Sequence, residues 1–218
     1  QKILFYNIYM ELKNEHLIFL LTLFIVYCYT LPRYSYYLPT IPIYDNDEAN
    51  LVKEITKTRT YEDKEFFYLT DPSVTKAFLP YVEEDEKELT RIISNVLLNW
   101  TGLFLKYVIN RPRPYQVDPS IDYLESKTGN TPALPAGHAF QAYYLSHILS
   151  EKYPSKKSLF KSLADKCNEV RIKAGIHYPS DGELSKILVD SILAFEGRKE
   201  VMCSFSCFAY PFNDIDKY

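Results

Sequence analysis

From residue 83 onward, apolar residues recur along the chain at the spacing of a helix. Between residues 83 and 104 they fall three or four positions apart, which places them on one face: Leu89, Ile92, Ile93, Val96, Leu97, Trp100 and Phe104. Similar patterns predict helices near 138–150, 155–173 and 180–195. No segment alternates apolar and polar residues as a half-buried strand does. The chain is therefore expected to be all-α.

Signals for helix starts agree with this pattern. The acidic run 83–86 suits a first turn, where the helix dipole favours negative charge. Asp71 followed by Pro72 predicts an N-cap and first helical residue. Ser180 with Glu183 matches the capping box S-x-x-E. The proline-rich stretch 111–137 is predicted to be a long loop, and such loops in compact domains are usually functional.

An uncharged apolar segment, residues 17–31, precedes this body. As a helix it spans about 22 Å, less than the ~30 Å hydrocarbon core of a bilayer. We interpret it as a single N-terminal membrane anchor; a signal segment and a helix buried against the body are the alternatives. The flanking charges Lys2, Lys13 and Arg33 are balanced, so they do not indicate which side of the membrane the body occupies.

Prolines mark the boundary between this segment and the body. Pro32, Pro39 and Pro42 interrupt helices and favour extended chain. We place the domain boundary near residue 40, which divides an N-terminal region, 1–40, from one helical domain, 41–218.

Composition narrows the function classes. A net charge of −3 and a pI near 5.9 give no basic face, so nucleic-acid binding is not expected. The four cysteines do not have the spacing of a disulfide framework, and no histidine lies near the closest pair. They are expected to be packing thiols rather than zinc ligands: Cys28, Cys167, Cys203 and Cys207.

Three polar clusters lie where predicted helices begin or end: KYVINRPRP at 106–114, PAGHA at 135–139 and NEVRIKAGIHYPSD at 168–181. Together the three clusters contribute several cationic side chains. The second cluster also places a glycine beside a predicted helix N-terminus, where free N–H groups attract anions. Arginine forks bind tetrahedral oxyanions through paired hydrogen bonds. The clusters therefore predict an anion site formed by Lys106, Arg113, Gly137 and Arg171.

Two histidines add chemistry to that site. Asp181 follows His177 by four residues, close enough to hold one tautomer of its ring. A nucleophile and a proton donor are then available from His177 and His138. The inferred reaction is phosphoryl transfer through a phosphohistidine.

The order and spacing of these residues resemble a known superfamily. Lys106, Arg113 and Pro114 meet the motif K-x6-R-P. Residues 135–138 approximate P-S-G-H, and residues 170–181 approximate S-R-x5-H-x3-D. These are the motifs of the type 2 phosphatidic acid phosphatases (PAP2), whose helical-bundle fold is shared by class A acid phosphatases and vanadium haloperoxidases.

The resemblance implies a role for each residue. His177 attacks phosphorus, oriented by Asp181, while His138 protonates the leaving group and then activates water. The non-bridging oxygens are held by Lys106, Arg113, Arg171 and the Gly137 N–H. No metal ion or other cofactor is implied. Two positions depart from the motifs: Ala136 replaces a serine that contacts phosphate, and Val170 replaces a serine outside the catalytic roles.

The sequence thus predicts a membrane-anchored phosphatase that hydrolyses phosphomonoesters, either lipid phosphates or soluble ones. The motif-bearing helices are too short and amphipathic for membrane spans, which favours a catalytic body on a tether over a six-span enzyme. One alternative is a vanadium-dependent haloperoxidase. Another is an accessory subunit of a membrane or viral assembly that keeps the fold for binding.

Overall fold

The computed structural model describes residues 19, 21–24 and 47–208, with backbone only for 198–208. Within these ranges every regular element is a helix, which confirms the all-α prediction. Most of the apolar segment 17–31 and the boundary near residue 40 lie outside the described residues, so the anchor and the domain division remain predictions.

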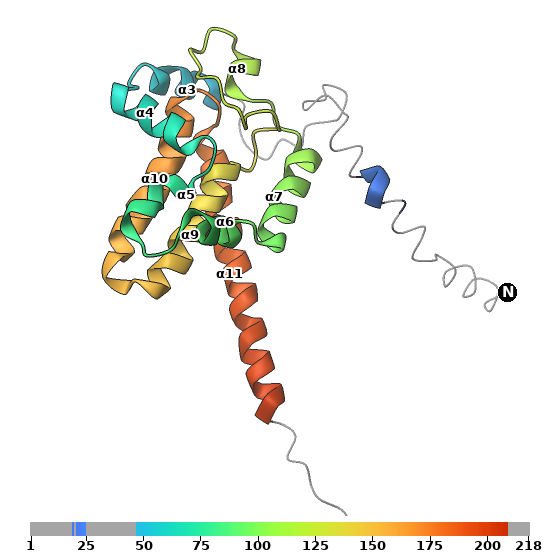
Figure 1. Ribbon diagram of the computed structural model, residues 1–218. Coiled ribbons are helices and arrows are strands. Elements are labelled where there is room, and N and C mark those ends of the chain that lie inside the picture. The colour runs from blue at the N-terminus through green and yellow to red at the C-terminus, as the bar shows by residue number, and fades with distance from the viewer. Residues whose placement is uncertain (1–18, 20, 25–46, 209–218) are drawn as a thin grey trace, which may run out of the picture.

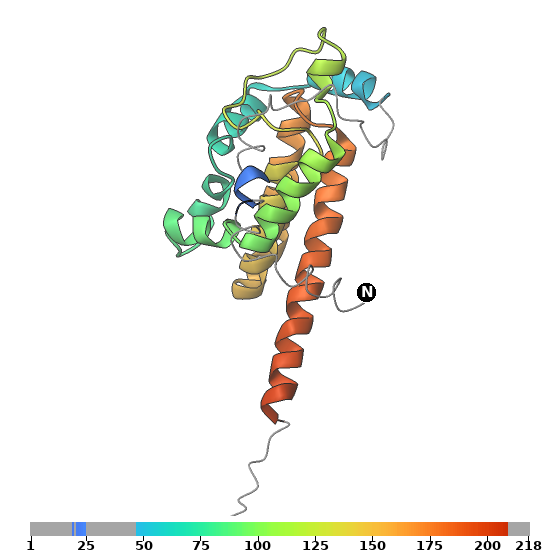
Figure 2. The same ribbon diagram turned by 90° about the vertical axis from the view of Figure 1, so that its right-hand side faces the viewer.

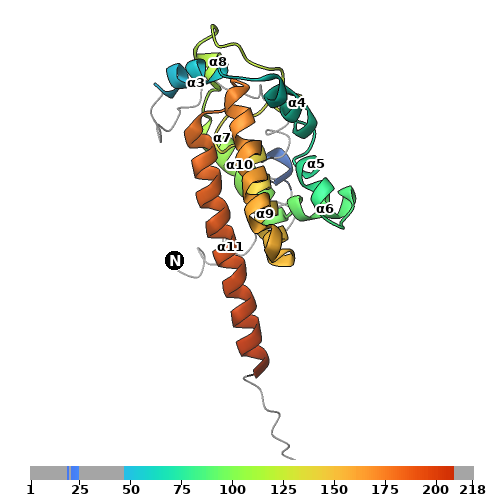
Figure 3. The ribbon, with the colours of Figure 1, turned by 90° about the vertical axis from the view of Figure 1, so that its left-hand side faces the viewer.

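The body is a bundle of helices (Figure 1). In chain order they are α3 (Glu48–Thr56), α4 (Tyr61–Thr70), α5 (Thr75–Phe78), α6 (Glu86–Ile93), α7 (Val96–Ile109), α8 (Pro114–Val117), α9 (Gly137–Lys152), α10 (Lys157–Lys173) and α11 (Pro179–Phe208), with 3-10 turns at Leu79–Tyr81 and Pro154–Lys156. Helix α9 packs against both α10 and α11, and the second half of α11 extends beyond the body (Figures 2 and 3).

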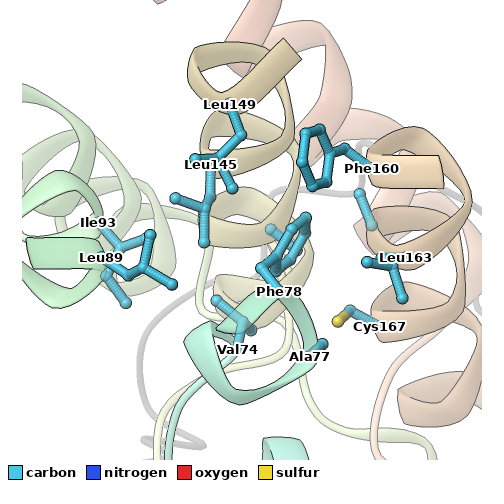
Figure 4. Close-up of a cluster of buried hydrophobic side chains, with 12 residues drawn as sticks. Val74, Ala77, Phe78, Leu89, Ile93, Leu145, Leu149, Phe160, Leu163 and Cys167 are labelled. Atoms are coloured by element: carbon cyan, nitrogen blue, oxygen red, sulfur yellow. The ribbon is translucent and has the colours of Figure 1, made fainter. Parts of the chain in front are cut away.

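The largest core cluster lies where α5 and α6 meet α9 and α10 (Figure 4). Phe78, Leu145 and Phe160 are fully buried at its centre. Burying each of these side chains contributes about 1.5–3 kcal/mol, which makes the cluster a main source of the free energy of folding. It holds α9 and α10 in place, and both helices also carry residues of the polar clusters.

The long helix predicted over residues 83–104 is two helices. Asp85 caps α6 by accepting a hydrogen bond from the Glu88 N–H at 2.8 Å. Asn95 caps α7 in the same way, accepting from the Leu98 N–H at 3.1 Å. The apolar period continues across the break because both helices bury one face. In the described part of the chain no single helix has the length and apolarity to cross a bilayer; α6 passes that test only jointly with segment 96–117, across a bend of 55°.

Two predicted helix caps are wrong. Asp71 ends α4 instead of starting a helix, and α5 begins at Thr75. Ser180 lies inside α11, which starts one residue earlier, and its hydroxyl donates to Glu48. In both cases the local pattern predicted a helix cap, but the side chain forms its hydrogen bonds with residues distant in sequence.

Candidate active site

The three polar clusters meet at one end of the bundle. The C-terminal ends of α7 and α10 and the N-terminal ends of α9 and α11 lie there (Figures 1 and 2). The first cluster covers the end of α7 and the loop after it, the second covers the start of α9, and the third covers the turn from α10 to α11. The predicted site residues therefore belong to segments that converge on one region.

Lys106 and Arg113 are buried cations beside the loop that precedes α9. The Lys106 Nζ donates to the Pro132 carbonyl at 2.6 Å. The Arg113 Nε donates to the Thr131 carbonyl at 2.9 Å, and its Nη1 to the Ile176 carbonyl at 2.8 Å. Among the described residues neither cation forms an ion pair with a carboxylate.

Their environment disfavours positive charge. Burial lowers the pKa of Arg113 to about 10. Burial and the neighbouring Arg113 lower the pKa of Lys106 well below its ordinary value. Because buried cations without a counter-ion are costly, this pair of side chains is a site that an anion would stabilise.

Arg171 differs from those two cations because it has a carboxylate partner. Its Nη1 donates to Asp71 at 2.6 Å, and its Nη2 donates to the hydroxyls of Ser126 and Thr128. The Nε of Arg171 is buried and has no hydrogen-bond partner among the described residues. Both Nη atoms of Arg171 are thus hydrogen-bonded to protein side chains, and the Nε–H remains available to donate to an oxyanion.

Asp71 is a site residue that the sequence analysis missed. Hydrogen bonds from Ser126 and Arg171 hold its pKa below the ordinary value, against the upward effect of burial. Its backbone carbonyl accepts from His138. No local signal reveals these roles, because Asp71 and Arg171 are 100 residues apart.

The His177 ring is held between a carboxylate and a cation. Its Nδ1 lies 3.0 Å from Oδ2 of Asp181, which also accepts from the Tyr178 N–H at 2.9 Å. Its Nε2 lies 3.3 Å from Nη1 of Arg113. Burial, followed by Arg113 and Lys106, lowers the pKa of His177 well below its ordinary value. The ring is therefore neutral, with the proton on Nδ1 and a lone pair on Nε2.

His138 is in the first turn of α9 and is also neutral. Burial and the nearby Arg171 lower its pKa to about 3. Its Nε2 donates to the Asp71 carbonyl at 2.9 Å, so Nδ1 is the acceptor nitrogen. The N-terminus of α9 lies against Lys106, since a Cβ on Gly137 would sit 3.8 Å from the Lys106 Cε.

A cavity of about 240 Å³ is lined by Tyr115, Tyr123, Leu124, Glu125, Ser126, Gly129, Asn130 and Ile176. Two of its lining residues contact the site directly: the Ile176 carbonyl accepts from Arg113, and the Ser126 hydroxyl accepts from Arg171. The predicted site residues themselves are not among those that line this cavity.

No protein-family model matches the chain, and no curated protein matches it at a significant level. Among solved structures it is similar to the crystal structure of a transmembrane PAP2-type phosphatidylglycerolphosphate phosphatase from Bacillus subtilis. That similarity covers 72% of this chain and 89% of the other, with 16% sequence identity and a TM-score of 0.45.

Proposed function

We propose that this chain is a PAP2-type phosphatase that hydrolyses phosphomonoesters through a phosphohistidine on His177. The observation that carries the proposal is the pair of buried, carboxylate-free cations beside a histidine lone pair. Arg113 approaches Nε2 of His177 at 3.3 Å, and Lys106 lowers the pKa of the same ring. A phosphoryl group bound there would compensate the cations and meet the nucleophile at once.

In the first step Nε2 of His177 attacks phosphorus and the bond to the ester oxygen breaks. Asp181 accepts the Nδ1–H and stabilises the ring as it becomes positively charged. The leaving oxygen takes a proton from Nδ1 of His138. Burial and then the nearby cations lower the pKa of His138; a bound phosphate dianion would offset the cations, and the ring is proposed to gain that proton together with the substrate.

In the second step water attacks the phosphohistidine. Nδ1 of His138, neutral again after the first step, accepts a proton from that water. The bond between phosphorus and Nε2 of His177 breaks, and inorganic phosphate leaves. Lys106, Arg113 and the Nε of Arg171 hold the non-bridging oxygens in both steps, which leaves no step that calls for a metal ion.

The proposed membrane anchor bears on which phosphate esters can reach the site. With residues 17–31 as a membrane anchor, the site would meet lipid phosphates at the bilayer surface as well as soluble phosphomonoesters. The cavity lined by Ile176 and Ser126, which accept hydrogen bonds from Arg113 and Arg171, is proposed to receive the leaving group.

The full chain should release phosphate from an aryl phosphate in the presence of EDTA, and His177→Ala should abolish that release. His147→Ala is the matched control, because His147 is an exposed histidine on α9. Rapid acid-free quenching should trap a phosphoryl group on the protein that survives alkali, is lost in acid and is absent from His177→Ala. Parallel assays with phosphatidic acid vesicles and glycerol phosphate distinguish lipid from soluble substrates.

Equal turnover by the wild type and His177→Ala would refute the proposal. A folded wild type that releases no phosphate from any of these esters would also refute it, and would favour the accessory-subunit alternative.

A further inference from the structure

Arg111 lies in the first motif cluster, two residues before Arg113, but its contacts are different. Its Nη1 donates to Oδ1 of Asp181 at 2.9 Å, the oxygen that His177 does not use. The same nitrogen donates to the Ser180 hydroxyl at 2.7 Å. Arg111 thus contacts the carboxylate of the His177–Asp181 pair from its other edge.

This contact bears on the charge of Asp181. The carboxyl is fully buried, and burial raises its pKa. Arg111 is the strongest influence in the opposite direction. A protonated Asp181 would no longer be a pure acceptor for the Nδ1–H of His177, and the ring would lose the preference that leaves Nε2 free.

Glu48 holds the guanidinium in this position. The Nη2 of Arg111 donates to Glu48 at 2.7 Å, and the guanidinium stacks 3.8 Å from the centre of the Tyr178 ring. The backbone N–H of Ser180 donates to the other Glu48 oxygen at 3.3 Å. Glu48 belongs to the first turn of α3, so a helix without a motif supports the histidine through Arg111.

We propose that Arg111, held by Glu48, is a positioning residue that keeps Asp181 ionised and directed at Nδ1 of His177. The catalytic consequence rests on the proposed function, in which His177 is the nucleophile. The consequence for the tautomer of His177 does not, because it follows from the hydrogen bonds alone.

The kinetic test is Arg111→Gln, assayed with an aryl phosphate across pH. We expect kcat to fall about 10- to 100-fold and KM to change less than about threefold, because Arg111 acts through Asp181 rather than on the phosphoryl group. Loss of the positive charge makes Asp181 harder to ionise, so the acidic limb of the pH profile should move to higher pH. Arg111→Lys, which keeps the charge, should recover part of kcat.

Two further arginine variants distinguish the positioning role of Arg111 from phosphate binding and from a general effect of removing an arginine. Arg113→Gln should raise both KM and the inhibition constant of inorganic phosphate, because Arg113 belongs to the anion site. Arg91→Gln, which changes an exposed arginine on α6, should alter neither kcat nor KM. Glu48→Gln should repeat the Arg111→Gln effect more weakly, and it provides the test if Arg111→Gln does not fold.

Nitrogen NMR of labelled histidine tests the inference without turnover. Wild-type His177 should carry its proton on Nδ1, and Arg111→Gln and Glu48→Gln should show a mixture of tautomers. An unchanged tautomer in both folded variants would overturn the inference, as would an unchanged kcat in an active enzyme. If the wild type has no phosphatase activity but the tautomer shifts, the proposed function fails and the positioning role stands.

Discussion

Ala136 is the N-cap residue of α9, and it stands where the motif P-S-G-H, which residues 135–138 resemble, has serine. Its backbone is extended, with φ −74° and ψ 104°, as an N-cap requires, but no side chain caps the helix. The first turn of α9 therefore presents its N–H groups without the hydroxyl that would satisfy one of them.

Ala136→Ser is expected to restore that hydrogen bond. A serine N-cap stabilises a helix by about 0.5–2 kcal/mol, and the change adds one buried atom. Urea denaturation should show the gain in the free energy of unfolding. If the hydroxyl also contacts phosphate, kcat/KM should rise by up to about tenfold.

The two readouts separate the two roles of that hydroxyl. Higher stability with unchanged kcat/KM would identify a helix cap alone. Lower stability would contradict the prediction and show that the site at Ala136, which has no exposed surface, cannot hold another atom.

The turn between α10 and α11 brings His177 to the site. Gly175 has a φ of +73°, in the left-handed region that side chains with a Cβ disfavour. A Cβ there would lie 3.0 Å from Ile121 Cγ2 and 3.2 Å from the backbone of Tyr123. Glycine is therefore favoured at position 175 for two reasons: the left-handed backbone conformation and the lack of space for a Cβ.

Gly175→Ala is expected to lower the free energy of unfolding by about 1–3 kcal/mol, because it combines backbone strain with a close contact. Gly197→Ala is the matched control. Gly197 lies in α11 with nothing within 4 Å of an added Cβ, so alanine should raise the free energy of unfolding by about 0.5–1 kcal/mol. Equal effects of the two substitutions in urea denaturation would contradict this account of the turn.

The protein as a whole folds around two neutral histidines and several buried cations. The folded state takes up a proton on His138 only near pH 3, whereas an unfolded chain does so near its ordinary pKa of 6.5. Between these pH values the unfolded state binds more protons. This contribution to stability is therefore complete above about pH 6.5 and is lost as pH falls.

The free energy of unfolding should consequently decrease between pH 8 and pH 5, by up to about 2 kcal/mol for His138. His138→Asn should reduce this decrease. His147→Asn, on the exposed part of the same helix, should leave it unchanged. An identical pH dependence in wild type and His138→Asn would show that His138 is already protonated at pH 5.

Local sequence was sufficient to predict the helical composition of the described residues, and the roles assigned to the site residues remain predictions. Helix α10 was predicted to within two residues because apolar spacing and its flanking residues agree. The break at Ser94 was missed because the apolar period runs through it, and only the Asn95 side chain marks it. The caps at Asp71 and Ser180 were wrong because their side chains have partners far along the chain.

The sequence by itself determined the helices and the three polar clusters, since helix formation and motif spacing depend on residues within a few turns of one another. Only the tertiary structure decided how the charges are paired. Asp71 meets Arg171, and Arg111 joins Glu48 to Asp181, across separations of 63 to 100 residues. Such pairs form because a charge buried by packing must find its counter-charge wherever the fold brings one. That same packing leaves Lys106 and Arg113 without a paired carboxylate among the described residues, which is the basis of the proposed anion site.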